Sequence, residues 1–181
     1  MRKVILDLAV SLDGFIEGPN KEIDWCIMEE DMQFDEFLDS IDTIFYGRVS
    51  YDMWGEYQAD ETTPAAEKKI WDAVHQKQKY VFSKMPKISD RVVYINENIP
   101  QEVEKIKAQP GKDIWLYGGA GLIKSFIDTD MIDIYRLAIH PVVLGSGTPL
   151  FDKLEQRINL KLISTKNTGS GVILTEYAKK V

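Results

Sequence analysis

Three short motifs, each following an apolar run that should form a buried strand, carry residue types suited to binding phosphate. Residues 117–121 (Tyr-Gly-Gly-Ala-Gly) join one such run to an apolar helical pattern, residues 47–50 (Gly-Arg-Val-Ser) follow a second run, and Ser83-Lys84 follows a third. Glycine lets a backbone approach a pyrophosphate closely, and a helix N-terminus offers free N–H groups and a positive dipole. A guanidinium and a hydroxyl after the second run would suit a second phosphate.

Each of these motifs, taken alone, also fits a simpler role. The glycine pair suits a tight strand-to-helix turn, Arg48 suits a solvated turn, and Ser83-Lys84 suits a capped strand end. The glycine motif matches neither Gly-x-Gly-x-x-Gly nor a P-loop, because no Lys-Ser/Thr follows it. Ligands of open α/β sheets bind outside the carboxyl ends of the strands. Three such motifs at three strand ends therefore predict a nucleotide site more specifically than any one of them.

Two other segments are candidates for the reacting end of such a site. Residues 11–16 (Ser-Leu-Asp-Gly-Phe-Ile) and 23–25 (Ile-Asp-Trp) form a glycine-containing loop that a tryptophan could close over a flat ring, excluding water; an ordinary surface loop is the alternative. Asp31, near the start of an expected helix, could supply a proton. Its three acidic neighbours, Glu29, Glu30 and Asp35, favour instead a simple interaction with the helix dipole.

The elements that must position these residues alternate along most of the chain. Hydrophobic periodicity predicts helices over residues 29–41, from about Ser50, over 64–75, from Ile99 to about 110, and from about Leu122. It predicts strands over residues 3–10, 43–46, 80–83, 91–95, 114–117 and 132–140, and a closing antiparallel pair over 160–165 and 172–177. This order predicts an α/β fold whose mainly parallel sheet is covered by helices and carries antiparallel strands at one edge.

Composition narrows the function classes. A chain of 181 residues without a linker is expected to form a single domain over 1–181. One cysteine and two histidines exclude a disulfide framework and most zinc centres, so no metal is expected. The net charge of −7 argues against nucleic acid as a partner. No run reaches the ~18 apolar residues of a membrane span, so we expect a soluble, cytoplasmic protein that acts on a small molecule.

The motifs taken in order resemble those of the dihydrofolate-reductase-like superfamily. Within it they are most similar to the branch of the C-terminal reductase domain of the bifunctional riboflavin-biosynthesis deaminase-reductase. The matching segments are residues 11–16, 23–25, 46–48 with Tyr51, 117–121, and 141–151 (Pro-Val-Val-Leu-Gly-Ser-Gly-Thr-Pro-Leu-Phe). They span nearly the whole chain, and the last is the most specific.

The resemblance implies a three-layer α/β/α fold with a mixed central sheet, NADPH as hydride donor, and roles for individual residues. Arg48 and Ser50, beside Gly47, would hold the adenosine-side phosphates, and Ser83 and Lys84 would border the adenine ribose. The residues implied at the pyrophosphate are Gly118, Gly119, Ala120 and Gly121, and those implied at the nicotinamide are Ala9, Asp13 and Ile16. Asp31 is similar in position to the active-site carboxylate of folate-reducing members.

The chain also departs from both relatives. It lacks the His-x-Glu and Cys-x-x-Cys motifs of the deaminase domain, and it reads Ile-Asp-Trp where dihydrofolate reductases usually carry Pro-Trp. The resemblance therefore implies a stand-alone NADPH-dependent reductase that acts on a C=N or C=O of a pterin-like or 5-amino-6-(ribosylamino)uracil-like compound. A divergent dihydrofolate reductase and a non-catalytic nucleotide-binding protein are the alternatives.

Two further expectations concern binding. The basic residues near the second and third motifs predict tighter binding of NADPH than of NADH. The riboflavin branch implies a homodimer, and we expect the long apolar segment 132–143 and the closing strands to need cover.

Overall fold

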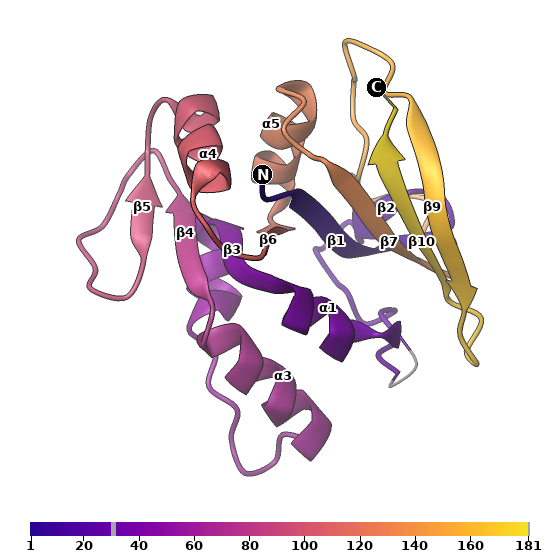
Figure 1. Cartoon of the computed structure of the whole chain (residues 1–181). Helices are drawn as coiled ribbons and strands as arrows, with labels where there is room; N and C mark the ends of the chain where they lie inside the picture. Colours follow the sequence, from indigo (N-terminus) through magenta and orange to yellow (C-terminus); the bar gives the residue numbers. More distant parts are fainter. Residues whose placement is uncertain (30–31, 181) are drawn as a thin grey trace.

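Eight strands form one mixed sheet in the computed structural model, which describes residues 1–29 and 32–180. Their order across the sheet is β5-β4-β3-β6-β1-β7-β10-β9 (Figure 1). The strands are β1 (Val4–Ser11), β3 (Ile41–Gly47), β4 (Gln78–Phe82), β5 (Val93–Ile95), β6 (Asp113–Gly118), β7 (Ile134–His140), β9 (Leu160–Asn167) and β10 (Ile173–Lys179). The six from β5 to β7 are mutually parallel, and β10 is antiparallel to both β7 and β9. A short pair, β2 (Phe15–Glu17) and β8 (Thr148–Pro149), lies apart.

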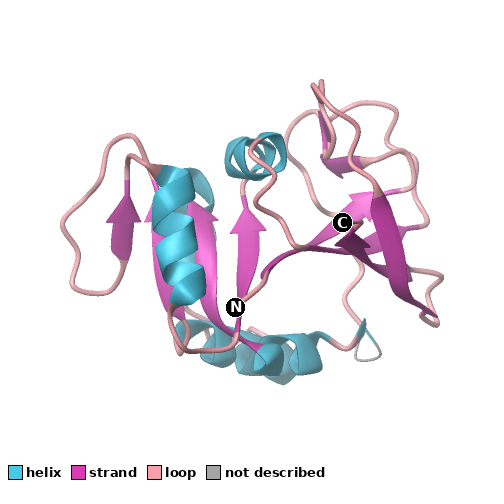
Figure 2. Cartoon of the chain, turned by 45° about the horizontal axis from the view of Figure 1, so that its top comes forward, coloured by secondary structure: helices cyan, strands magenta, loops and turns pink. Residues whose placement is uncertain are grey.

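Helices cover both faces of the sheet (Figure 2). On one face, the apolar sides of α4 (Ile99–Ala108) and α5 (Ala120–Asp128) pack against side chains of β1, β3 and β6. On the other face lie α1 (Phe34–Ser40), α3 (Ala65–His75) and the π-helical turn η2 (Tyr51–Gly55), which continues the short α2 (Arg48–Ser50). The expected α/β/α layering with a mixed, mainly parallel sheet is confirmed. Within the described residues, no helix combines the length and apolarity of a membrane span.

Burial on both faces of the sheet explains the continuous apolar run at the start of β1. Helices cover both faces of the sheet at this strand. The segment 132–143 is not the uncovered surface that the sequence suggested, because β7 lies between β1 and β10. Strand β9 is one of the two edge strands of the sheet, and its Leu162 and Ile163 are each 50% exposed.

Two sequence-based boundaries were wrong. The helix expected over 29–41 begins only at Phe34, because Gln33 has a left-handed backbone (φ 56°) that a helix cannot continue through, and Ile41 already belongs to β3. The loop expected to include residues 11–16 and 23–25 contains β2, whose three residues are too few to give a periodic signal. Asp31, the predicted acid, lies outside the described residues.

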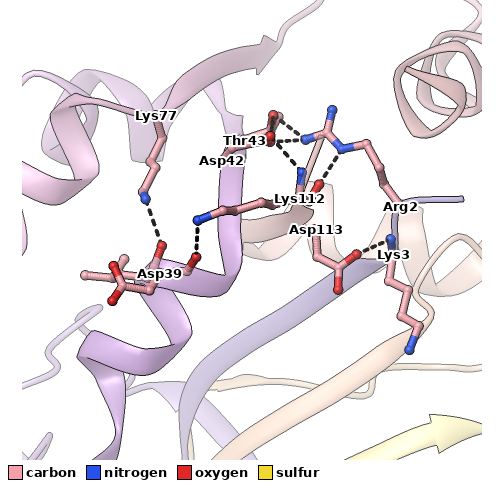
Figure 3. A network of polar contacts seen from close by, with 9 residues as sticks. Arg2, Lys3, Asp39, Asp42, Thr43, Lys77, Lys112 and Asp113 are labelled. Carbon is pink, nitrogen blue, oxygen red and sulfur yellow. Dashed lines mark hydrogen bonds and ion pairs between the residues drawn. The ribbon is translucent and has the colours of Figure 1, made fainter. Parts of the chain in front are cut away.

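A polar network fixes the amino ends of three adjacent parallel strands (Figure 3). The buried Arg2 forms an ion pair with Asp42 and donates to the Thr43 hydroxyl, and Asp42 also accepts from the Lys112 N–H at 2.8 Å. The Lys3 N–H donates to Asp113 at 2.8 Å. These contacts join β1, β3 and β6 at their amino ends.

Candidate nucleotide and active site

The three predicted phosphate motifs meet at the carboxyl edge of the sheet. Strand β3 pairs with β4 so that Gly47 lies opposite Phe82, the residue before Ser83. On its other side β3 pairs with β6, and Tyr46 lies opposite Gly118. The structure therefore places the residues of the second, third and first motifs side by side, as expected for parallel strands.

Two of these turns approach each other so closely that a side chain at either glycine would be crowded. A Cβ on Gly47 would lie 3.2 Å from the Gly119 nitrogen and 3.4 Å from the Gly118 carbonyl oxygen. A Cβ on Gly119 would lie 2.8 Å from the Ser50 hydroxyl oxygen. Gly118 has φ +113°, a conformation that side-chain-bearing residues rarely adopt. The glycines therefore bring the backbone of one turn against the hydroxyl and backbone of the other, which forms a cradle of polar main-chain groups.

Helix α5 starts at this cradle. Its N-cap is Gly119, and no side chain caps the helix N-terminus. The first N–H groups of an α-helix have no partner within the helix and carry the positive end of its dipole. A phosphate at this end would be met by the N–H groups that follow Gly119, including those of Ala120 and Gly121.

The basic side chains at the cradle are partly engaged by an acid. Arg48 forms an ion pair with Asp52 at 2.8 Å, and Lys87 reaches the same carboxylate at 3.1 Å. Hydrogen bonds from these two cations lower the pKa of Asp52. The Ser83 hydroxyl donates to the Met85 carbonyl at 2.9 Å, so it shapes the turn after β4.

Lys84 lies in the same turn and is exposed, with no ion pair to any described residue. It is therefore the least constrained cation of the three motifs, and its ammonium group is available to an anion at this edge.

The loop predicted at the nicotinamide is held against the 141–151 segment. The Asp13 carboxylate accepts the N–H groups of Leu144 (3.1 Å) and Gly145 (2.7 Å) and the Ser11 hydroxyl (2.7 Å), and these hydrogen bonds lower its pKa. Strand β2 pairs with β8 in the same region. Asp13 therefore joins the two most widely separated signature motifs, a task the sequence alone did not reveal.

Ala9 and Ile16, the other two residues predicted at the nicotinamide, lie in different surroundings. Ala9 is half-buried in β1 opposite Ala138 of β7. Ile16 packs against the core on the α4/α5 face. Their proximity to a nicotinamide stays a prediction, as does the proton-donor role of Asp31.

A buried ion pair on the α1 face is the feature that sequence reasoning missed. Asp7 of β1 lies opposite Arg136 of β7, and the guanidinium donates to its carboxylate. Arg136 is fixed in turn by the carbonyl oxygens of Met32 (3.1 Å) and Gln33 (3.3 Å), and it lies 4.8 Å above the ring of Phe37. The only sequence signal was a lone acid in an otherwise apolar strand.

The Asp7 carboxyl has unusual electrostatics. Burial raises its pKa from 3.8 to about 6, although the charge and hydrogen bond of Arg136 act to lower it, and the nearby Glu176 raises it further. Carboxyls that titrate near neutral pH are frequent at functional sites, because they can hold or release a proton there.

The Tyr46 hydroxyl, on the same face of the sheet, is the one buried side-chain polar atom among the described residues that has no hydrogen-bond partner. The Tyr46 ring packs against Tyr117 with centroids 4.7 Å apart and against Tyr51 at 5.7 Å. Burial raises its pKa above the usual tyrosine range. A buried donor without a hydrogen-bond partner destabilises the folded state. This donor belongs to Tyr46, the residue immediately before Gly47 of the glycine cradle.

The model of the RibD C-terminal domain matches residues 2–174. The chain belongs to the RibD C-terminal domain family. The sequence is 56% identical over 177 residues to the uncharacterized protein YyaP of Bacillus subtilis strain 168, covering 97% of this chain and 94% of that protein. The family resemblance found in the motifs is thus confirmed.

Solved structures support the same fold. A putative riboflavin biosynthesis protein from Shewanella sp. PV-4 superposes with a TM-score of 0.80 at 23% identity, covering 99% of both chains. The deaminase/5-amino-6-(5-phosphoribosylamino)uracil reductase of Thermotoga maritima gives 0.70 at 12% identity, over 99% of this chain and 57% of that one. Dihydrofolate reductase from Enterococcus faecalis, complexed with NADP(H), gives 0.67 at 13% identity, over 99% and 97%. Family and fold together indicate an oxidoreductase.

Within the described residues, no cluster of His, Cys, Asp and Glu side chains is arranged to bind a metal ion.

Proposed function

We propose that the chain is an NADPH-dependent reductase that reduces a C=N or C=O bond of a pterin-like or 5-amino-6-(ribosylamino)uracil-like small molecule. The observation that carries the proposal is the contact between the Gly47 turn and the Gly118-Gly119 turn at the start of α5. A dinucleotide needs such a cradle, because its pyrophosphate must approach backbone N–H groups closely.

The residues around the cradle fit this cofactor. The N-terminus of α5 suits the pyrophosphate. Arg48 and Ser50 follow β3, and Lys84 follows β4, so these residues would offer two cations and a hydroxyl to the adenosine-side phosphates. Bound NADPH supplies a hydride, and the protein contributes orientation, exclusion of water and a proton. A 2′-phosphate would compete with Asp52 for Arg48, since both are anions within reach of one guanidinium.

The test is the loss of NADPH absorbance with two acceptors, 5-amino-6-(5-phosphoribosylamino)uracil and dihydrofolate, with methotrexate added in a parallel series. Reduction of the uracil compound that methotrexate does not inhibit supports the leading proposal. Methotrexate-sensitive reduction of dihydrofolate supports the divergent folate reductase. NADPH binding without turnover of a broad panel of C=N and C=O acceptors supports a nucleotide-binding protein, and failure to bind NADPH contradicts all three.

We also propose that the chain forms a homodimer. Strand β9 is an uncovered sheet edge on which Leu162 and Ile163 are half exposed, and Ile173 of the neighbouring strand is 40% exposed. Exposed apolar edge strands tend to pair or aggregate unless covered. Light scattering at micromolar concentration should give about twice the chain mass of 20.7 kDa, and a particle of 20.7 kDa would reject the dimer.

A further inference from the structure

We propose that the Asp7 carboxyl holds and delivers the proton for the reduction, with Arg136 positioning it. This inference rests on the proposed reductase function and identifies its acid. It differs from the sequence-based hypothesis, which gave that role to Asp31.

Asp7 lies in a polar row that crosses the sheet on the α1 face. Arg136 is its neighbour in β7, Glu176 lies opposite Arg136 in β10, and Ser164 lies opposite Glu176 in β9. On the other side, the β1–β6 register, which pairs Leu6 with Leu116, brings Tyr117 next to Asp7. Side chains of paired residues on neighbouring strands share a face of the sheet. The row therefore includes Tyr117, the residue that immediately precedes Gly118 of the glycine cradle.

The ion pair leaves half of the Asp7 carboxyl available. Oδ2 accepts from Arg136, whereas Oδ1 accepts no hydrogen bond from any described residue and is not among the fully buried side-chain atoms. The backbone carbonyl of Asp7 is fixed as well, because the Trp115 indole donates to it at 3.1 Å. One carboxyl oxygen is therefore anchored, and the other can carry a proton and present it to a bound molecule.

The same surroundings suit a group that changes its protonation near neutral pH. Asp7 is only 8% exposed, and this burial favours the neutral acid. Among the described residues, the charged and titratable groups next to Asp7 are Arg136 from β7, Glu176 from β10 and Tyr117 from β6. Arg136 opposes the shift and Glu176 reinforces it, so the balance of the row sets the proton affinity of Asp7.

Bound NADPH would supply a hydride with its electron pair to the carbon of the C=N or C=O, which would form a C–H bond and leave the cofactor oxidised. The Oδ1–H bond of Asp7 breaks, and an N–H or O–H bond forms on the substrate. Asp7 is left as a carboxylate that Arg136 stabilises, and solvent returns the proton after the product leaves. The substrate would thus gain two electrons and two hydrogens, one as the hydride and one as the proton from Asp7.

The first experiment is a carboxyl ¹³C NMR titration of the intact protein labelled at aspartate. We expect one carboxyl to titrate near pH 6 and to disappear from the spectrum of Asp7→Asn. In Glu176→Gln the same carboxyl should titrate at lower pH, because a neighbouring negative charge has gone. If the Asp7 carboxyl titrates in the ordinary aspartate range, the proposal is overturned. This measurement needs neither cofactor nor substrate, so it stands even if the proposed reductase function fails.

The second experiment compares Asp7→Asn with Asp133→Asn as a matched control. Asp133 also pairs with a cation, Lys107 at 3.0 Å, and accepts the Val4 N–H at 2.8 Å, but it lies at the amino end of β7. The probes are 5-amino-6-(5-phosphoribosylamino)uracil and dihydrofolate, whichever is reduced. Asp7→Asn should reduce kcat by about 10²–10⁴-fold, with the NADPH Kd unchanged, and Asp133→Asn should retain kcat.

The pH profile distinguishes a proton donor from a structural residue. Wild-type kcat should fall as pH rises above about 6, and in Asp7→Asn this dependence should be lost. A variant Asp7→Asn that binds NADPH, keeps wild-type turnover and keeps the pH profile would overturn the proposal, as would a turnover loss in Asp31→Asn without one in Asp7→Asn. Failure of the wild type to bind NADPH would instead count against the reductase function.

Discussion

Replacing Gly47 by alanine adds one methyl group where the two glycine turns touch. The new Cβ would lie 3.2 Å from the Gly119 nitrogen, 3.4 Å from the Gly118 oxygen and 3.5 Å from the Leu122 Cβ. Two of these atoms are backbone atoms, which cannot rotate away, so the glycine turn must move by a few tenths of an ångström. The Gly47 backbone itself (φ −72°) accepts alanine without strain.

The expected magnitude follows from these contacts. Overpacking typically lowers the free energy of unfolding by about 1–3 kcal/mol, and the lower entropy of an unfolded chain with alanine in place of glycine raises it by about 0.4–1 kcal/mol. We therefore expect Gly47→Ala to lower the free energy of unfolding by about 1–2 kcal/mol and to weaken NADPH binding by about tenfold or more, because the N–H groups of the cradle are displaced.

Urea denaturation and a fluorescence titration with NADPH measure the two effects. Gly121→Ala is the matched stability control, since it places the same methyl in the same motif with no atom within 4 Å and should stabilise α5 by about 0.5–1 kcal/mol. If Gly47→Ala is as stable as the wild type and binds NADPH equally well, the two turns do not form the nucleotide cradle.

Three further predictions follow from charges in the structure. The pKa of Asp7 is about 6 in the folded protein and 3.8 in the unfolded chain, so its contribution to stability is present below pH 4 and is lost as pH rises through 6. Relative to Asp7→Asn, the free energy of unfolding of the wild type, measured in urea, should fall by about 2 kcal/mol between pH 4 and pH 7. A difference between the two proteins that stays the same at both pH values would refute this. Asp52→Asn should lower the NADPH Kd several-fold, because it releases Arg48 from its ion pair, and should leave the NADH Kd unchanged. Calorimetry measures both constants, and equal changes for the two cofactors would count against a 2′-phosphate at Arg48. Arg2→Met should lower the free energy of unfolding by about 1–3 kcal/mol, because it removes the ion pair with the partly exposed Asp42 and the hydrogen bond to Thr43, without affecting the NADPH Kd of the folded protein. An unchanged free energy of unfolding would contradict that role of the network.

The parts of the fold that sequence predicted are those governed by local periodicity and by parallel-strand geometry. Alternating apolar runs and helical stripes gave the order of strands and helices, and the rule that strand ends share one edge brought Gly47, Ser83 and Gly118 together in advance. Short or irregular elements escaped prediction. The β2–β8 pair involves too few residues for a pattern, and the left-handed Gln33 that delays α1 has no distinctive side chain.

The acid site could not be predicted because it depends on pairing across the sheet. Asp7 and Arg136 are 129 residues apart in sequence, and only the β1–β7 register makes them neighbours. From the sequence, Asp7 was one charge in an apolar strand and Arg136 one cation in another. Burial and the row of paired charges, which give Asp7 its raised pKa, exist only in the folded sheet.

A calorimetric titration with NADPH and with NADH measures whether the strand ends around Gly47 and Gly119 bind a phosphorylated nicotinamide dinucleotide. A hydrogen bond to a charged group contributes roughly 1.5–3 kcal/mol, so we expect NADPH to bind at least about tenfold more tightly than NADH, with one molecule bound per chain. Equal dissociation constants for the two cofactors would contradict the assignment of the basic residues to a 2′-phosphate, and no binding of either would contradict the site itself.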